Sequence, residues 1–218
     1  MPNYGIVPHI ITKIYNDANV NVKYGFFPWT RSYLYVKDGT WNGSAIWGKT
    51  EEREKECFFS DVFLVDQCVL FYHVDKPINW TGDTKDLKGK TIGIVLGSAK
   101  TEILKQAEDK GILKYDTGST DDNIFMKLLN KRIDAVDETK NVGLTYIAKG
   151  LAKGDVAKIQ HTKSLGDWQY HFILSKKNVA NIKYLKIFND GFKKIKEDGT
   201  LDKMWKDFYS GAYNSTNK

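Results

Sequence analysis

The sequence predicts an α/β protein of two lobes, each built on a mainly parallel sheet that is flanked by helices. Apolar, strand-like runs alternate with helix-periodic stretches of about ten residues, which is typical of parallel strands joined by helical crossovers. The alternation stops once, where the polar turn residues of INWTGDTKDLKGK (78–90) separate two such runs. A chain of 218 residues is long enough for one large domain or two small lobes.

The first run begins with a helix over 6–15, where apolar residues recur every three or four positions. VNVKYGFF (20–27) reads as a strand because β-formers alternate with polar residues. Pro28 then favours a helix start, since the first helical turn needs no N–H there, and this helix ends at Gly39. The run continues with a short strand at 44–47, a helical turn at 50–56 and a long apolar strand at 67–74.

The second run starts with a strand at 91–98 and again alternates helix and strand. The pattern predicts helices at 100–111, 121–132 and 142–150, and strands at 133–136 and 169–175. A long amphipathic helix over 182–195 ends at Gly199, and Thr200 caps a last helix at 201–209. We assign residues 1–76 and 173–218 to lobe 1 and residues 77–172 to lobe 2, with the long strands as the crossings.

Composition excludes several function classes. The net charge of +6 comes from scattered Lys and Arg without an Arg-rich arm, so nucleic acid is not an expected partner. Four dispersed His and two Cys show no metal-ligand spacing, and Cys57 and Cys68 are predicted to be buried thiols rather than a disulfide. GKT (89–91) lacks the first Gly of a phosphate loop and precedes its strand, so no cofactor is expected. No apolar run reaches the ~20 residues of a membrane span, and no signal-peptide pattern opens the chain.

Arg53 stands at an unusual place in the pattern. Thr50 fits a helix N-cap, and Glu51 and Glu52 suit the positive end of the helix dipole. An Arg in this first turn opposes the dipole, at a cost of about 0.3–1 kcal/mol. Two interpretations remain open from the residues alone: a surface ion pair with Glu52 or Glu56, or a guanidinium that holds a ligand carboxylate through two hydrogen bonds.

A second candidate anion site follows the strand TIGIV. That strand ends near Gly97, and Ser98 is predicted to be the N-cap of the next helix. Free N–H groups and the helix dipole make such a position suitable for a carboxylate or phosphate. The alternative is a capped helix with nothing bound.

Several motifs in a fixed order carry a family resemblance. T-x-x-R (50–53) precedes FFSD, an apolar strand, LKGKTIGIVLGSA, KRIDAV, SKKN and EDGTLDKMWKDF. This order resembles the extracytoplasmic solute-binding proteins of the amino-acid-binding family, and FFPWTR (26–31) resembles a branch of it with PW-x-R. The resemblance implies a two-lobed periplasmic-binding-protein-like fold whose first strand in lobe 1 is missing here. It also implies a periplasmic or extracytoplasmic monomer that passes a small-molecule ligand to an ABC permease or a sensor partner.

By this resemblance, Arg53 clamps the α-carboxylate of the ligand together with Thr50, Gly48 and Ser98, and Trp47 forms an aromatic wall. Trp29, Trp168 and Tyr170 are further candidate aromatic contacts; simple packing is the alternative for each, and for Trp29 it is the favoured one.

The chain departs from the family pattern at the ammonium end. The family places an acidic residue three positions after D-A-V, whereas this chain has Thr139 there, preceded by Asp137 and Glu138. Either a neighbouring acid such as Glu138 takes the role, or the ligand lacks an α-ammonium group. Gly48 and Ala99 also replace a Ser and a Thr of the usual pattern.

The function expected from the resemblance is binding with hinge closure rather than catalysis. One alternative is an enzyme like cyclohexadienyl dehydratase on the same scaffold, for which Glu138, Asp137 or His171 would be the acid. Another is a ligand-sensing domain of a receptor.

Overall fold

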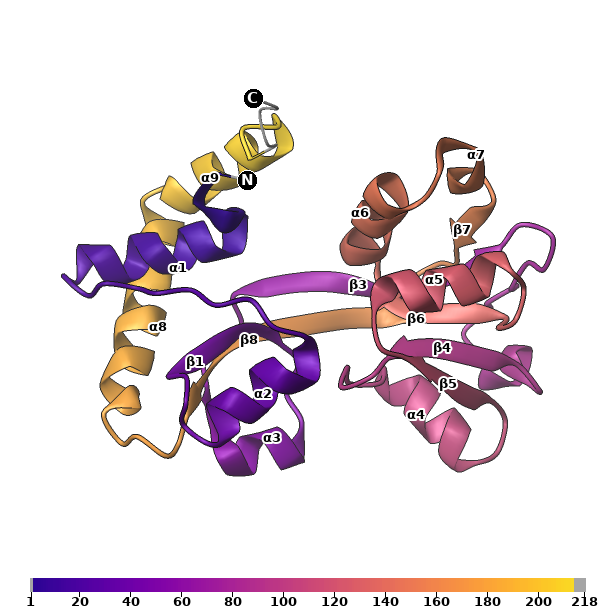
Figure 1. Cartoon of the computed structure of the whole chain (residues 1–218), viewed down its shortest axis with the longest axis horizontal. Helices are drawn as coiled ribbons and strands as arrows, with labels where there is room; N and C mark the ends of the chain where they lie inside the picture. The colour runs from indigo at the N-terminus through magenta and orange to yellow at the C-terminus, as the bar shows by residue number, and fades with distance from the viewer. Residues whose placement is uncertain (1, 214–218) are drawn as a thin grey trace. The chain divides into compact units, whose positions relative to one another are not determined.

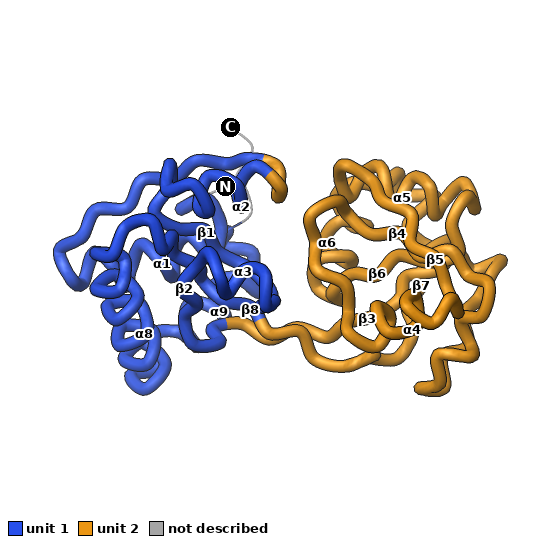
Figure 2. Tube along the Cα trace, turned by 90° about the horizontal axis from the view of Figure 1, so that it is seen from below, with its two compact units in different colours: residues 1–27, 31–63, 170–218 blue, residues 28–30, 64–169 orange. Residues whose placement is uncertain are grey.

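The computed structural model describes residues 2–213 and divides the chain into two compact units (Figure 2). Unit 1 comprises residues 1–27, 31–63 and 170–218, and unit 2 comprises residues 28–30 and 64–169. Residues 64–76, which the sequence assigned to lobe 1, therefore belong to unit 2. The reason is that residues 68–73 of β3 (Leu64–His73) pair with β6 and β7, which are strands of that unit.

Unit 1 is built on a small antiparallel sheet. β8 (Gly166–Ser175) lies between β1 (Gly43–Trp47) and β2 (Cys57–Phe59), and both pairs are antiparallel. The expectation of a mainly parallel sheet is thus wrong for this unit, because the strand that returns from unit 2 runs opposite to both of its neighbours. The helices of unit 1 are η1 (Pro2–Tyr4), α1 (Ile6–Asp17), α2 (Trp29–Lys37), α3 (Glu51–Glu56), α8 (Asn181–Glu197) and α9 (Thr200–Tyr209). The first two residues of α2 are assigned to unit 2, and the rest of that helix, from Arg31, to unit 1.

The apolar face of α1 forms much of the unit 1 core. Ile10 and Ile14 are fully buried, and α1 packs against α8 (Figure 1). Gly191 of α8 permits this close approach, because a Cβ there would stand 2.6 Å from Ile14 Cγ2. Phe188 joins the two helices to the sheet through its contact with the ring of Phe172, at 5.0 Å between centroids.

Residues 20–27 form neither a strand nor a helix, so the strand predicted there is wrong. Their aromatic side chains contact neighbouring residues instead. The ring centroids of Tyr24 and Tyr4 are 5.6 Å apart, and the Tyr24 hydroxyl donates to Pro8 O at 2.7 Å. The alternating aromatic residues that suggested a strand therefore pack against nearby side chains, and their backbone does not pair with a neighbouring strand.

Unit 2 is a mixed sheet in the order β3-β6-β4-β5, with β7 beside β3. The pairs β4–β5 and β4–β6 are parallel, and the pairs that β3 makes with β6 and β7 are antiparallel. Its remaining elements are β4 (Thr91–Val95), β5 (Lys114–Gly118), β6 (Ala135–Thr139), β7 (Ile159–His161), η2 (Thr84–Leu87), α4 (Glu102–Asp109), α5 (Asp121–Leu129), α6 (Lys140–Gly150) and α7 (Lys153–Val156).

Helices cover the unit 2 sheet so that apolar side chains are buried on both of its faces. One cluster contains Phe71, Phe125 and Val136, and the other contains Leu70, Leu104 and Ala135. The parallel strands β4, β5 and β6 each lead into a helix, so the starts of α4, α5 and α6 gather at the carboxyl edge of the sheet (Figure 1). In open α/β sheets this edge is where ligands bind.

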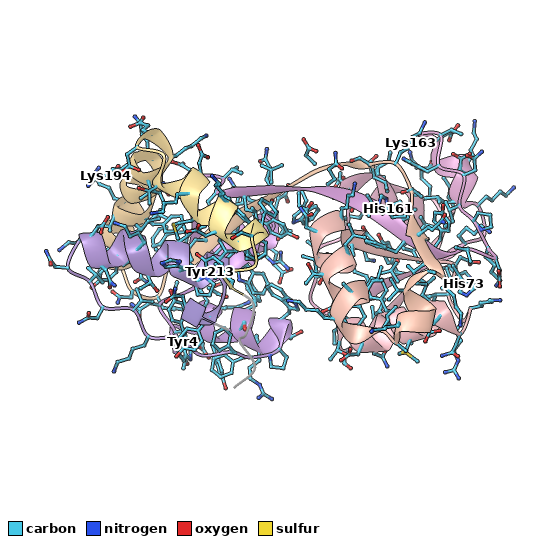
Figure 3. The ribbon with its side chains drawn as sticks, turned by 90° about the horizontal axis from the view of Figure 1, so that it is seen from above. Tyr4, His73, His161, Lys163, Lys194 and Tyr213 are labelled. Carbon is cyan, nitrogen blue, oxygen red and sulfur yellow. The ribbon has the colours of Figure 1, made fainter. Side chains whose placement is uncertain are left out.

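Other side chains of chemical interest serve packing. His73 and His161 lie on the β3–β7 pair of unit 2 (Figure 3), where the His161 ring stacks edge-on with Phe71. Within residues 2–213, no three His, Cys, Asp or Glu side chains gather as a metal site would require. Cys57 and Cys68 are free and buried, which confirms the predicted thiols. Over the same residues, no helix has both the length and the apolar character of a membrane span.

Candidate functional site

Arg53 is a buried cation at the start of α3. Its side chain is 9% exposed, so an exposed ion pair on the surface does not describe it. Nη1 donates to Gly48 O at 2.9 Å, and Glu56 pairs with Lys37. Burial lowers the pKa of Arg53, but a guanidinium remains charged in proteins.

Two aromatic rings flank the guanidinium. Arg53 Cζ lies 4.8 Å from the Trp47 ring and 5.8 Å from the Tyr33 ring, and the two ring centroids are 5.7 Å apart. Contacts of this kind stabilise a cation by about 0.5–2 kcal/mol, more when the pair is desolvated. The rings and the Gly48 carbonyl therefore hold the buried charge in one orientation.

The local backbone brings these groups together. Thr50 is extended and caps α3, since its Oγ1 accepts from Arg53 N at 3.3 Å, as the sequence predicted. In β1 the register shifts between Ser44 and Trp47, and Ile46 has a φ of 66°. A β-branched residue rarely adopts positive φ, so the strand is strained one residue before Trp47.

The turn after β4 in unit 2 differs from the expected geometry. Ser98 is exposed and its N–H donates to Val95 O at 3.0 Å, so it belongs to a tight turn. The N-cap of α4 is Thr101, three residues later, which corrects the predicted N-cap at Ser98. Gly97 lies in this turn with a φ of 89°, a conformation that is not helical, so the helix begins only after the turn.

Asp137 of β6 accepts hydrogen bonds from Thr101, the residue that caps α4. This buried carboxylate accepts from Thr101 N at 3.2 Å, Thr101 Oγ1 at 2.8 Å and Tyr115 OH at 2.6 Å. Burial raises the pKa of Asp137, while these hydrogen bonds oppose the change. Asp137 therefore ties β6 to β5 and to the start of α4, and has a structural role.

Glu138 and Thr139 end β6 at the same edge. Glu138 is partly buried, and its Oε1 accepts from Thr139 N at 2.7 Å and from Thr139 Oγ1 at 3.2 Å. Desolvation raises the pKa of Glu138 to about 8, and the charges of Asp121 and Asp137 add to the effect. Near neutral pH this acid therefore holds its proton unless a cation lowers its pKa.

The remaining predicted residues lie in different surroundings. Trp29, at the start of α2, is 39% exposed, and Trp168 is partly buried on the part of β8 that belongs to unit 2. Tyr170 is buried in unit 1, and its carbonyl accepts from Phe63 N. His171 is buried beside it, with Nδ1 2.7 Å from Ser60 O.

The structure thus brings Arg53, Gly48, Thr50 and Trp47 together in unit 1, and it places Ser98, Glu138 and Thr139 on one edge of unit 2. Sequence reasoning missed Tyr33, which lies one helical turn after Trp29. It also missed Thr101, although a Thr before the acidic residue that opens a helix is an N-cap signal.

Sequence comparison relates the chain to known proteins. A family model described as bacterial extracellular solute-binding proteins, family 3, matches residues 3–211. The arginine-binding extracellular protein ArtP of Bacillus subtilis (strain 168) is 26% identical over 167 residues. That match covers 74% of this chain and 60% of ArtP, so the chain spans about three fifths of the length of this curated relative.

Solved structures share the fold. An ancestral arginine-binding protein bound to arginine matches with a TM-score of 0.77 at 23% identity, covering 93% of this chain and 86% of that chain. The ancestral amino acid-binding protein AncCDT-1, a precursor of cyclohexadienyl dehydratase, matches with a TM-score of 0.72 at 18% identity, covering 93% and 83%. These likenesses confirm the predicted two-lobed, periplasmic-binding-protein-like fold.

Proposed function

Because the chain belongs to the bacterial extracellular solute-binding proteins, family 3, we propose that it binds a small solute bearing a carboxylate, for delivery to an ABC importer. The solute class is an amino acid or a derivative of one. We place this activity in the periplasm or another extracytoplasmic compartment, where the protein acts as a monomer. Binding rather than catalysis is the activity of most of this family.

One observation carries the proposal: a buried guanidinium at a helix start, held between the rings of Trp47 and Tyr33. A guanidinium that is held in one orientation can bind a carboxylate through two parallel hydrogen bonds. The first-turn N–H groups of α3 also favour an anion. Arg53 is therefore the residue we assign to the ligand carboxylate, with Thr50 and Gly48 shaping its turn.

The carboxyl edge of unit 2 supports the assignment of the other end of the solute. Glu138 stands beside Thr139, where family members carry an acid, and Asp121 raises the pKa of Glu138 further. An ammonium or guanidinium group of the solute would relieve this repulsion. We assign that group to Glu138, with Ser98, Trp168 and Trp29 as further contacts. Because one structural relative is bound to arginine and ArtP is an arginine-binding protein, L-arginine is the first solute to test.

The experiment is calorimetric titration with a panel of L-amino acids, L-arginine first, on wild type and Arg53→Lys. Lys keeps the charge but loses the planar fork, so we expect affinity to fall by about 2–5 kcal/mol. Lys55→Gln is the matched control, because it removes an exposed cation from the same helix. Equal affinity for wild type and Arg53→Lys would contradict the site, and no response to any member of the panel would contradict the solute class.

A dehydratase function is the second candidate, and Glu138 is the observation that favours it. Asp137 is engaged by three hydrogen bonds and His171 is buried against Ser60, which leaves Glu138 as the acid of the three. A carboxylic acid with a pKa of about 8 is protonated at neutral pH, as a general acid must be. Incubation with prephenate and arogenate tests this candidate, since product formation that Glu138→Gln abolishes would establish the enzyme.

A further inference from the structure

The Tyr33 hydroxyl is a buried polar group that the fold leaves without a hydrogen bond. Its oxygen is shielded from solvent, and it has no hydrogen-bond partner within residues 2–213. A buried hydroxyl in this state lowers the stability of the folded protein, so native proteins rarely retain one without a use. The position of Tyr33 identifies that use.

Tyr33 lies within the aromatic frame of the buried cation. Its ring is 5.8 Å from Arg53 Cζ and 5.7 Å from the Trp47 centroid, and Trp47 is 4.8 Å from Arg53 Cζ. All three sides of this triangle are shorter than 6 Å, so an anion that reaches the guanidinium also reaches the neighbourhood of the phenol.

The chemistry of the phenol suits an anion. Burial is the main reason that the pKa of Tyr33 is raised. Electrostatic interaction with Cys57 and Glu52 raises this pKa further, and Arg53 lowers it. The hydroxyl therefore keeps its proton at neutral pH and is a donor. A carboxylate has two oxygens with about four acceptor sites, so it can accept from a guanidinium and from a phenol together.

We propose that the Tyr33 hydroxyl donates a hydrogen bond to the solute carboxylate that Arg53 binds, and that Tyr33 is a specificity-determining residue of this site. The inference rests on the proposed function, which it extends by a second donor. Tyr33 lies on α2 and Arg53 on α3, so two separate elements of unit 1 define where the carboxylate sits.

The test is Tyr33→Phe, which removes one oxygen and nothing else. Because the hydroxyl has no hydrogen-bond partner among the described residues, its removal raises the melting temperature by about 2–4 °C. Because it donates to the bound carboxylate, the same change weakens binding about 10- to 100-fold. These opposite signs separate a ligand contact from a packing role. Tyr35→Phe is the matched control: it lies on the same helix, packs edge-on against Phe27, and changes neither quantity.

Two probes keep this inference distinguishable from the proposed function. L-arginine tests the whole solute, and acetate tests the carboxylate alone. If L-arginine or acetate binds wild type and Tyr33→Phe weakens it, the inference stands, even where acetate binds and L-arginine does not. If every probe that binds wild type also binds Tyr33→Phe with the same affinity, the inference is overturned and the proposed function survives. If neither probe binds wild type at millimolar concentration, the inference is overturned, whereas the proposed function is decided by the rest of the L-amino-acid panel.

A double-mutant cycle with Arg53→Lys supplies an independent measurement. If both side chains hold one carboxylate, the combined loss of affinity is smaller than the sum of the two single losses. Strict additivity would place the hydroxyl on a different part of the solute and would overturn the assignment to the carboxylate.

Discussion

Glu138 makes the stability of this protein depend on pH in a direction unusual for a carboxyl group. Its pKa rises from 4.5 to about 8 because burial disfavours the charged form. The folded state therefore binds this proton more tightly than the unfolded state does. By linkage, the free energy of unfolding falls as pH rises between these two values and is constant above the higher one.

The magnitude follows from the two pKa values. A group in this window changes stability by at most about 1.4 kcal/mol per pH unit. The slope lessens as the folded-state pKa is approached, so the loss between pH 6 and pH 8 is about 2 kcal/mol. Glu138→Gln removes this dependence, because Gln does not ionise and its oxygen still accepts from Thr139 N. Above pH 8 the variant should thus be the more stable protein.

The assay is urea unfolding of wild type and Glu138→Gln at half-unit steps from pH 5.5 to pH 8.5. The pKa values of Asp121 and Asp137 are also raised, so the difference between the two proteins reports the titration of Glu138 together with its coupling to these two acids. Glu102→Gln, at the exposed start of α4, is the control and should follow wild type. Parallel curves for wild type and Glu138→Gln across this range would show that Glu138 titrates as an ordinary acid and would refute the reasoning.

Three further predictions concern packing and buried groups. Gly143→Ala lowers the free energy of unfolding by about 1–3 kcal/mol despite the better helix propensity of Ala, because its Cβ would stand 2.2 Å from Phe71 Cε2; equal or higher stability would contradict this packing. Asp137→Asn costs about 1–3 kcal/mol and speeds exchange of the Thr101 amide, and unchanged exchange would exclude the cap. Burial raises the pKa of Cys57 and Cys68 to about 11, so iodoacetamide at pH 8 should label them only after denaturation; rapid native labelling would show exposed thiolates.

Much of the element order follows from the sequence because local signals act there. The helix periodicity of residues 6–15 and 182–195 leads to α1 and α8, and Thr50 caps α3 as its residue type favours. The order of motifs from T-x-x-R to the closing helix predicted the family, which the family model over residues 3–211 confirms. Local patterns and motif order suffice for these features.

Features that depend on a distant partner were not predictable in this way. VNVKYGFF has a strand pattern, but a strand also needs a neighbour, and the rings of Tyr4 and Tyr24 pack there instead. Asp137 caps α4 from 36 residues away, so Ser98 looked like the better cap in the sequence. In the sequence, Tyr33 cannot be told from other aromatic residues of a helix. Only its distance to Arg53 in the structure distinguishes it.

The central position of β8 in unit 1 has a consequence for biosynthesis. A nascent chain that ends at residue 169 already holds every residue of unit 2, whereas β1 and β2 still lack the strand that pairs with both. Since domains generally fold as units during synthesis, unit 2 can complete first, and the anion site that we propose around Arg53 forms last. Binding of the proposed solute at this site therefore has to wait until residues 170–175, α8 and α9 have been synthesised.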